Sequence, residues 1–312
     1  MYNPSKVLRI LQQRILTNIL GYVNLPSYIY GFEAGKSIKK MADIHVGKDV
    51  VLSLDISDYF PSIKQYMVKG MFIGMGIKDT AATVLSELVT YKAFVPQGSI
   101  TAPKISNIIS AYTFGPKIEA FCKARNMDMT IYADDITISY NNTKAELADR
   151  IEVANEVIRF VKTTLQEFRF RVNSKKTKVM PNYRRQWVCG AVVNEKVNML
   201  KKERAKLRAI VFNCQKNGID AEANKTGMKP EKFISKHIGR INWLCQLNED
   251  KGVELKLRFK KIVTPYLKKY PEIDIPELAW NSSIEMPYIE SPEDKAVFDV
   301  NDKTDAIEMK VS

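Results

Sequence analysis

The spacing of apolar residues alternates between helical and strand periods over the first 200 residues of the chain. Apolar side chains recur at helical spacing in segments 5–20, 37–46, 63–75, 79–91, 104–124 and 144–167. Short apolar and β-branched runs, typical of buried strands, occur at 49–56, 127–131, 136–140, 168–172, 178–181 and 187–193. Proline and glycine indicate loops at 25–35 and 96–103. This mixture of strands and helices predicts an α+β body.

The pattern changes after residue 200, where long helices with many basic residues follow one another. We expect helices at about 200–216, 230–248 and 253–269, the last one interrupted near Pro265. From Pro271 onward the chain is acidic and contains several prolines, which favours weak structure. The sequence therefore predicts an α+β body over 1–195, a helical module over 196–270 and an acidic tail over 271–312.

The chain is strongly basic, and its charge is unevenly distributed. Its 312 residues include 48 Lys and Arg against 35 Asp and Glu, for a net charge of +13. Segment 271–312 holds 11 of the acidic and 3 of the basic residues, so residues 1–270 carry a net charge of +21. Such a body favours a polyanionic partner, for which a nucleic acid is the best candidate. Hydrophobic residues make up 45% of the chain, which excludes a disordered or fibrous protein.

Cysteine and histidine are too few and too scattered to predict a zinc site. The chain has two histidines, and Cys122, Cys189, Cys214 and Cys245 form no Cys-x-x-Cys pair. Without a recognisable signal peptide, this pattern predicts reduced thiols and a cytoplasmic protein. The longest apolar runs, such as 50–54, are far too short to span a bilayer, so we expect no membrane partner.

The candidate chemistry lies in two aspartate-containing segments at strand ends. Asp55 follows the apolar run 50–54, and Asp134 and Asp135 lie between two predicted strands. A carboxylate beside buried apolar residues is unfavourable unless its charge is compensated. Carboxylates that meet at one point repel one another, and Mg²⁺ would remove that repulsion. Two such ions can stabilise the attacking and leaving oxygens of a phosphoryl transfer. An Asp-Asp pair between strands is, on its own, more often a simple turn.

In combination, these segments resemble the reverse transcriptases, and among them the retron type. That family has an apolar strand with Asp, two residues, a second Asp and an aromatic pair, followed later by Tyr-Ala-Asp-Asp; here Asp55 and Asp134 are 79 positions apart. Residues 96–103 read Pro-Gln-Gly-Ser-Ile-Thr-Ala-Pro, similar to the family's nucleotide-pocket loop. Residues 173–177 read Asn-Ser-Lys-Lys-Thr, similar to its Asn-x-x-Lys-Thr motif. The resemblance runs from about residue 2 to residue 270.

Shorter segments resemble the retron group in particular. Gly31-Phe32 is similar to a finger segment of that group. Met41 stands at the Asn position of the group's Asn-Ala-x-x-His signature. Cys189 stands at the Thr position of its Val-Thr-Gly segment, and Ala102 replaces a Ser of the pocket loop. The resemblance implies a right-hand polymerase fold, with fingers and palm made of an antiparallel sheet plus helices over 1–195 and a helical thumb over 196–270.

The resemblance also implies the catalytic residues. Asp55, Asp134 and Asp135 would hold two Mg²⁺ ions, with the backbone carbonyl of Ile56 as a further ligand. Lys176 would donate a proton to the leaving pyrophosphate, because a lysine near phosphates combines positive charge with an acidic proton.

The nucleotide pocket and the nucleic-acid contacts follow from the same resemblance. Asp58 matches the position whose backbone helps to bind the triphosphate of a dNTP, and Phe60 matches the aromatic position that excludes a 2′-OH. Gln97 and Gly98 would line the pocket. The residues expected to contact template and primer are Tyr132, Ala133, Lys201, Lys202, Arg204 and Arg240.

We therefore expect an RNA-directed DNA polymerase that copies a structured non-coding RNA of msr-msd type into short DNA. Retron enzymes act in anti-phage defence with an effector protein, which the resemblance implies here. Two alternatives stay open: a group II intron-like or defence-associated reverse transcriptase, and an inactive RNA-binding scaffold on a polymerase fold. A P-loop NTPase is a weaker reading of 31–37, because three residues separate its glycines and the motif needs four.

Overall fold

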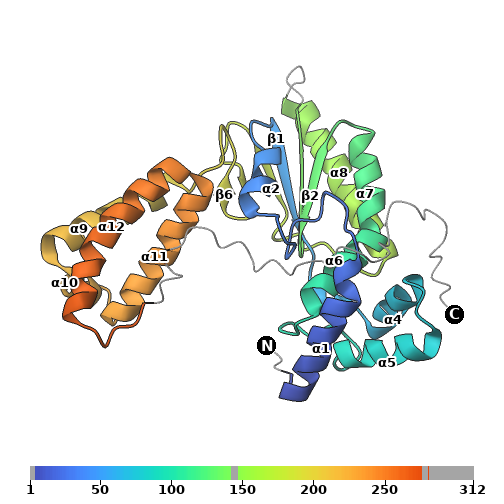
Figure 1. Ribbon diagram of the computed structural model, residues 1–312. Helices are drawn as coiled ribbons and strands as arrows, with labels where there is room; N and C mark the ends of the chain where they lie inside the picture. Colours follow the sequence, from blue (N-terminus) through green and yellow to red (C-terminus); the bar gives the residue numbers. More distant parts are fainter. Residues whose placement is uncertain (1–3, 142–146, 276–279, 281–312) are drawn as a thin grey trace. The chain divides into compact units, whose positions relative to one another are not determined.

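The computed structural model describes residues 4–141, 147–275 and 280, and of residues 147–150 only the backbone (Figure 1). These residues form two compact units. The first contains the described residues of 1–37 and 48–184, and the second contains those of 38–47 and 185–287.

The first unit combines helices with one sheet. Its helices are α1 Lys6–Asn18, the short 3₁₀ helix η1 Leu20–Tyr22, α3 Tyr59–Ser62, α4 Gln65–Gly74, α5 Asp79–Val89, α6 Ala102–Tyr112, α7 Phe114–Lys123 and α8 Leu147–Glu167. Its strands are β1 Val50–Asp55, β2 Asp128–Tyr132, β3 Asp135–Tyr140 and β4 Lys178–Pro181. The predicted α+β class, an antiparallel sheet plus helices, is confirmed.

The four strands form an antiparallel sheet in the order β2-β3-β1-β4. Side chains alternate between the two faces of a strand, so every second residue of β1 points to the same side. Leu52 and Leu54 are fully buried in the hydrophobic core, together with Ile138 of β3. Helices α7 and α8 cover this apolar face (Figure 1), and between them Phe121 stacks on Phe160 with ring centroids 4.0 Å apart.

The opposite face of the same strands carries polar side chains. Ser53 pairs in register with Thr137, and Asp55 pairs with Asp135 at the end of the ladder. Tyr132 of β2 lies opposite Asp135 on the other side of β3. The alternation that buries the leucines of β1 therefore places the carboxylates together at one end of the polar face.

The structure corrects three expectations for the first 200 residues. The helix expected over 104–124 is two helices, α6 and α7, because Thr113 leaves helical geometry and Pro116 follows it. The strand expected over 168–172 is reduced to one bridge between Val172 and Ile56. The strand expected over 187–193 is a hairpin, since Cys189 and Gly190 both have positive φ in the turn between its strands.

The second unit is mainly helical. It contains α2 Ile38–Ile44, β5 Trp187–Val188, β6 Ala191–Val192, α9 Lys201–Asn217, α10 Ile219–Lys225, α11 Pro230–Leu247 and α12 Glu249–Lys269. The three long helices predicted after residue 200 are confirmed as α9, α11 and α12 (Figure 1), whereas the short helix α10 was not expected.

Helix α12 packs closely on α11 near its start and continues without a break to Lys269. A Cβ at Gly252 would lie 2.3 Å from the Cα of Cys245, so the two helices approach with no room for a side chain. Val263 is fully buried next to Pro265, and α12 continues through this proline. The expectation of a break there was wrong, because tertiary packing outweighs the hydrogen bond that proline removes.

Most of the expected acidic tail, 271–312, lies outside the described residues. Trp280 is described, and its ring centroid lies 6.3 Å from that of Phe259 on α12. All four cysteines, Cys122, Cys189, Cys214 and Cys245, are free. In the described part of the chain, no helix combines the length and the hydrophobicity needed to cross a membrane.

Candidate active site

The three candidate carboxylates meet where β1 ends beside the β2–β3 turn. Ala133 and Asp134 form this two-residue turn, and Ala133 has a φ of 52°, which is uncommon for a residue with a Cβ. The backbone N–H of Ile56 donates to the carbonyl of Asp134 over 2.9 Å. Together with the pairing of Asp55 and Asp135, this hydrogen bond fixes all three aspartates at one place.

Burial and mutual repulsion perturb two of the three carboxylates. Burial, together with the nearby charges of Asp134 and Asp55, raises the pKa of Asp135 to about 6. Burial also raises the pKa of Asp134. A cluster of carboxylates that resists ionisation fits a divalent cation, because the cation supplies the missing positive charge. Among the described residues, no set of three His, Cys, Asp or Glu side chains has the arrangement of a finished metal site.

Lys176 is the cation next to this cluster. Its Nζ donates to Oδ1 of Asp55 over 2.9 Å, and its side chain is 62% exposed while that of Asp55 is 10% exposed. The hydrogen bond to Asp55 raises the pKa of Lys176, so the ammonium form is favoured. The backbone N–H of Asn173 donates to the carbonyl of Asp55 over 2.7 Å, which ties the lysine loop to the end of β1.

A basic hollow beside the cluster was missed in the sequence. The N–H of Ser57 donates to the carbonyl of Arg171 over 2.8 Å. Ser57 is two residues after Asp55, about 7 Å along an extended chain, so the backbone of Arg171 lies close to the carboxylates. The hollow has a volume of about 260 Å³. Its lining residues are Ser57, Asp58, Ser62, Lys64, Tyr66, Arg169 and Arg171. From the sequence, only a predicted pairing of residues 170–172 with the end of β1 could have indicated this hollow.

The predicted nucleotide-pocket residues lie on two segments. Asp58 is exposed, has a φ of 48° and lines the basic hollow. Phe60 follows on α3 and is half-buried, with its ring centroid 5.5 Å from that of Tyr59. Gln97 and Gly98 are exposed on the loop before α6, where Gly98 has a φ of 107° that requires glycine.

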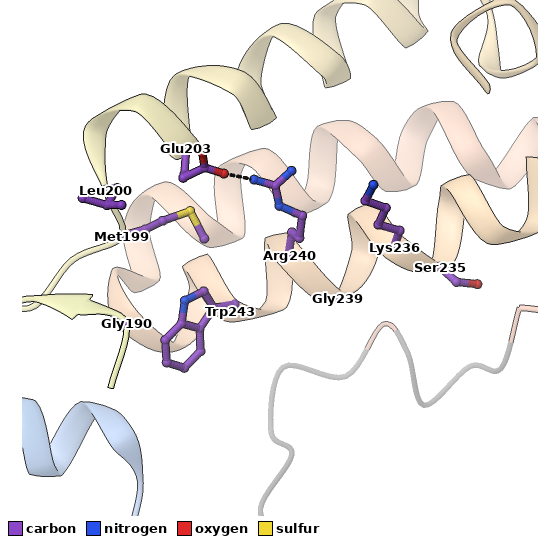
Figure 2. A pocket seen from close by; sticks show the side chains of 9 residues that line it. All are labelled: Gly190, Met199, Leu200, Glu203, Ser235, Lys236, Gly239, Arg240 and Trp243. Atoms are coloured by element: carbon purple, nitrogen blue, oxygen red, sulfur yellow. Dashed lines mark hydrogen bonds and ion pairs between the residues drawn. The ribbon is translucent and has the colours of Figure 1, made fainter. Parts of the chain in front are cut away.

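The predicted nucleic-acid residues of the helical unit have different surroundings. Lys201 and Lys202 are exposed at the start of α9, and Arg204 is half-buried beside a second hollow. Arg240 forms an ion pair with Glu203, as Figure 2 shows. Its charge is therefore partly neutralised inside the protein, unlike that of the two lysines.

Figure 2 also shows the pocket around this ion pair, a hollow of about 480 Å³ in the helical unit. Lys236, Gly239 and Trp243 line it from one face of α11. The indole of Trp243 is half-buried at this pocket, whereas the neighbouring Leu244 is buried. His237 is buried, with Nδ1 2.7 Å from the carbonyl oxygen of Phe233.

Comparisons with known proteins indicate the family to which the chain is similar. The family described as reverse transcriptase (RNA-dependent DNA polymerase) matches residues 2–226. The retron Ec86 reverse transcriptase of Escherichia coli is 30% identical over 68% of this chain and 64% of its own length. The retron Mx65 reverse transcriptase of Myxococcus xanthus is 27% identical over 83% of this chain and 61% of its own length. The chain thus spans less than two thirds of either relative.

Among solved structures, apo telomerase from Candida tropicalis superposes with a TM-score of 0.46 at 10% identity. The match covers 86% of this chain and 49% of that one.

Proposed function

Because this chain belongs to the reverse transcriptase family and is similar to retron reverse transcriptases, we propose that it is an RNA-directed DNA polymerase of retron type. The observation that carries the proposal is the meeting of Asp55, Asp134 and Asp135 at one end of the polar sheet face. A scaffold that only binds RNA has no need for three partly buried carboxylates that repel one another.

The carboxylates would hold the metal ions of the reaction. Asp55, Asp134 and Asp135, with the carbonyl of Ile56, are the proposed ligands for two Mg²⁺ ions. When bound, these ions would neutralise charge on the attacking and leaving oxygens. The raised pKa values of Asp134 and Asp135 support this role, since burial and the neighbouring carboxylates make the ionised forms unfavourable without a bound cation.

Two groups of cations would act on the phosphates of the dNTP. Lys176, fixed by Asp55 and protonated, donates a proton to the pyrophosphate that leaves. Arg171, which lines the basic hollow together with Ser57, would bind phosphates of the nucleotide. The backbone at Asp58 lies in the same hollow and would contact the triphosphate.

The remaining pocket residues would recognise the sugar and the base. Phe60 lies beneath the sugar and excludes a 2′-OH, so dNTPs are used in place of NTPs. Gln97 and Gly98 line the pocket on the opposite segment. The positive φ of Gly98 supports this role, because a glycine lets the backbone approach a ligand closely.

Residues of each unit would contact template or primer. Tyr132 and Ala133 pack near the primer end, next to the metal ligands. Residues 1–195 form fingers and palm, and 196–270 form a thumb that holds the nucleic-acid backbone by charge. Lys201 and Lys202 are exposed and suited to phosphate contacts. Arg204 and Arg240 are half-buried, and the ion pair of Arg240 with Glu203 weakens its contribution.

The biological setting follows from the relatives. The matched proteins of Escherichia coli and Myxococcus xanthus are both named as retron reverse transcriptases, which supports a template of msr-msd type and an RNA–DNA product. We extend the proposal to anti-phage defence with an effector protein, and to the cytoplasm, where the free cysteines stay reduced.

Single carboxylate substitutions test the proposal. Asp55→Asn and Asp134→Asn should each abolish DNA synthesis on a primed RNA template, while RNA affinity stays within about twofold of wild type. Asp128→Asn, at the other end of β2, is the matched control and should remain active. DNA synthesis by either active-site variant would refute the metal assignment.

A further inference from the structure

Phe32 is a strained and exposed aromatic residue close to the carboxylates. Its φ is 60°, and its side chain is 38% exposed. Its ring centroid lies 5.8 Å from that of Tyr132, with the two planes inclined by 45°. Tyr132 pairs with Asp135 in the sheet, so the two rings lie next to the proposed metal ligands.

The sheet holds the segment before Phe32 in place. The N–H of Tyr30 donates to the carbonyl of Ile131 over 2.8 Å, and the N–H of Ile131 donates to the carbonyl of Tyr28 over the same distance. At Gly31 a Cβ would lie 2.9 Å from the backbone nitrogen of Ala133, so the chain can pass this closely only as glycine. The segment is thereby fixed against the β2–β3 turn.

Helix α6 holds the residues on both sides of Phe32. Asn107 is 1% exposed, and its Nδ2 donates to the carbonyl of Gly31 over 2.6 Å and to Oε1 of Glu33 over 2.9 Å. Lys104 forms an ion pair with Glu33 over 2.9 Å, with both side chains largely buried. These contacts impose the backbone conformation of Phe32 from both sides.

This arrangement is difficult to explain by stability alone. A left-handed backbone is unfavourable for a bulky residue and persists only where the surroundings enforce it. A phenylalanine that contributed only to the core would be buried, whereas this ring remains in contact with solvent beside a second aromatic ring. Such a pair is a surface on which a nucleic-acid base can stack without sequence preference.

We propose that Phe32, with Tyr132, forms an aromatic platform for the base of the terminal primer nucleotide. The inference rests on the proposed polymerase function. The terminal nucleotide is the part of the primer that must lie at the metal ligands, and the platform is adjacent to them. Phe32 would act as a positioning residue, because it aligns the primer end and takes no part in bond formation.

Photo-crosslinking tests the contact directly. Full-length protein is bound to an RNA template with a DNA primer that carries 5-iododeoxyuridine at its 3′ end, and the crosslinked peptide is identified by mass spectrometry. We expect a crosslink to Phe32 that falls about tenfold in Phe32→Leu and persists in Phe32→Trp. Tyr183→Leu removes another exposed aromatic side chain and should leave the crosslink unchanged.

Two results would overturn the platform. One is an unchanged crosslink from the primer end in Phe32→Leu. The other is a stronger crosslink to Phe32 when the iodinated base is placed at the templating position, since Phe32 would then contact the template.

Kinetics give a second readout that misfolding would not imitate. Phe32→Leu should add the first nucleotide about tenfold more slowly with template–primer affinity within about twofold of wild type, and Phe32→Tyr should restore the rate. Wild-type protein that binds both a generic RNA and RNA from the native locus, and makes no DNA on either, would refute the proposed function. Wild-type synthesis with an unaffected Phe32→Leu variant would refute the platform alone.

Discussion

Replacement of Lys176 tests the proposed proton transfer to the leaving pyrophosphate. The Nζ of this lysine lies 2.9 Å from Oδ1 of Asp55, and Asp55 raises its pKa, so at neutral pH the group carries a proton that it can donate. Lys176→Gln keeps the length and polarity of the side chain and removes both the charge and the acidic proton. We expect slower nucleotide addition with little change in dNTP affinity.

The structure indicates that the rate lost in Lys176→Gln is near the lower limit for general acid catalysis. A positioned acid contributes about 10²- to 10⁴-fold in rate. The side chain of Lys176 is 62% exposed, so water can reach the leaving group and replace part of its function. We therefore expect Lys176→Gln to reduce the rate of the chemical step by about 10²-fold.

Single-turnover addition of one dNTP, measured by rapid quench, gives this rate without the contribution of product release. Lys175→Gln is the matched control, because Lys175 is an exposed neighbour in the same loop. Lys176→Arg separates charge from proton donation, since arginine keeps the charge but is a very weak acid. A rate close to wild type in Lys176→Gln, or an equal loss in Lys175→Gln, would refute the assignment. Full recovery in Lys176→Arg would show that only charge matters.

Three further predictions concern selectivity, packing and pH. Phe60→Ala should raise NTP incorporation relative to dNTP incorporation in a competition assay, and unchanged selectivity would show that Phe60 only packs against the core. Gly252→Ala should lower the free energy of unfolding by about 1–3 kcal/mol in urea titrations, because the new Cβ meets the backbone of Cys245. The control Gly239→Ala has open space at its Cβ and should show no such loss. Burial lowers the pKa of His237 below its usual 6.5, so the unfolded chain binds the proton more readily and stability is lost as pH falls below about 6.5. Between about pH 7.5 and pH 5.5 the melting temperature should therefore fall less in His237→Gln than in wild type, and equal slopes would contradict this account.

The sheet and its carboxylates follow from local sequence patterns. The run that ends at Asp55 is a largely apolar strand, and the two strands around Tyr-Ala-Asp-Asp alternate in a way that fixes which of their side chains share a face. The two strands joined by a two-residue turn must pair, so Asp134 and Asp135 have only one place to lie. The family resemblance predicted that Asp55 lies beside Asp134 and Asp135. The register of β1 with β3, which pairs Asp55 with Asp135, explains why it does.

Other features depend on contacts that no local pattern contains. Arg171 lies near the site only because the chain around Val172 returns to the end of β1, through one bridge too short to predict as a strand. The conformation of Phe32 is imposed by Asn107, which is 75 positions later in the sequence. The uninterrupted α12 likewise depends on tertiary packing near Pro265, where Val263 is fully buried.

Primer extension on an RNA template tests the central claim most directly. Wild-type protein and the double variant Asp134→Asn/Asp135→Asn would be given a DNA primer, dNTPs and Mg²⁺, first on a generic RNA and then on RNA transcribed from the native locus. We predict DNA product with the wild type on at least one of these templates, and none with the variant on either. A wild-type protein that binds both RNAs and extends neither would contradict the account and identify the chain as an inactive scaffold.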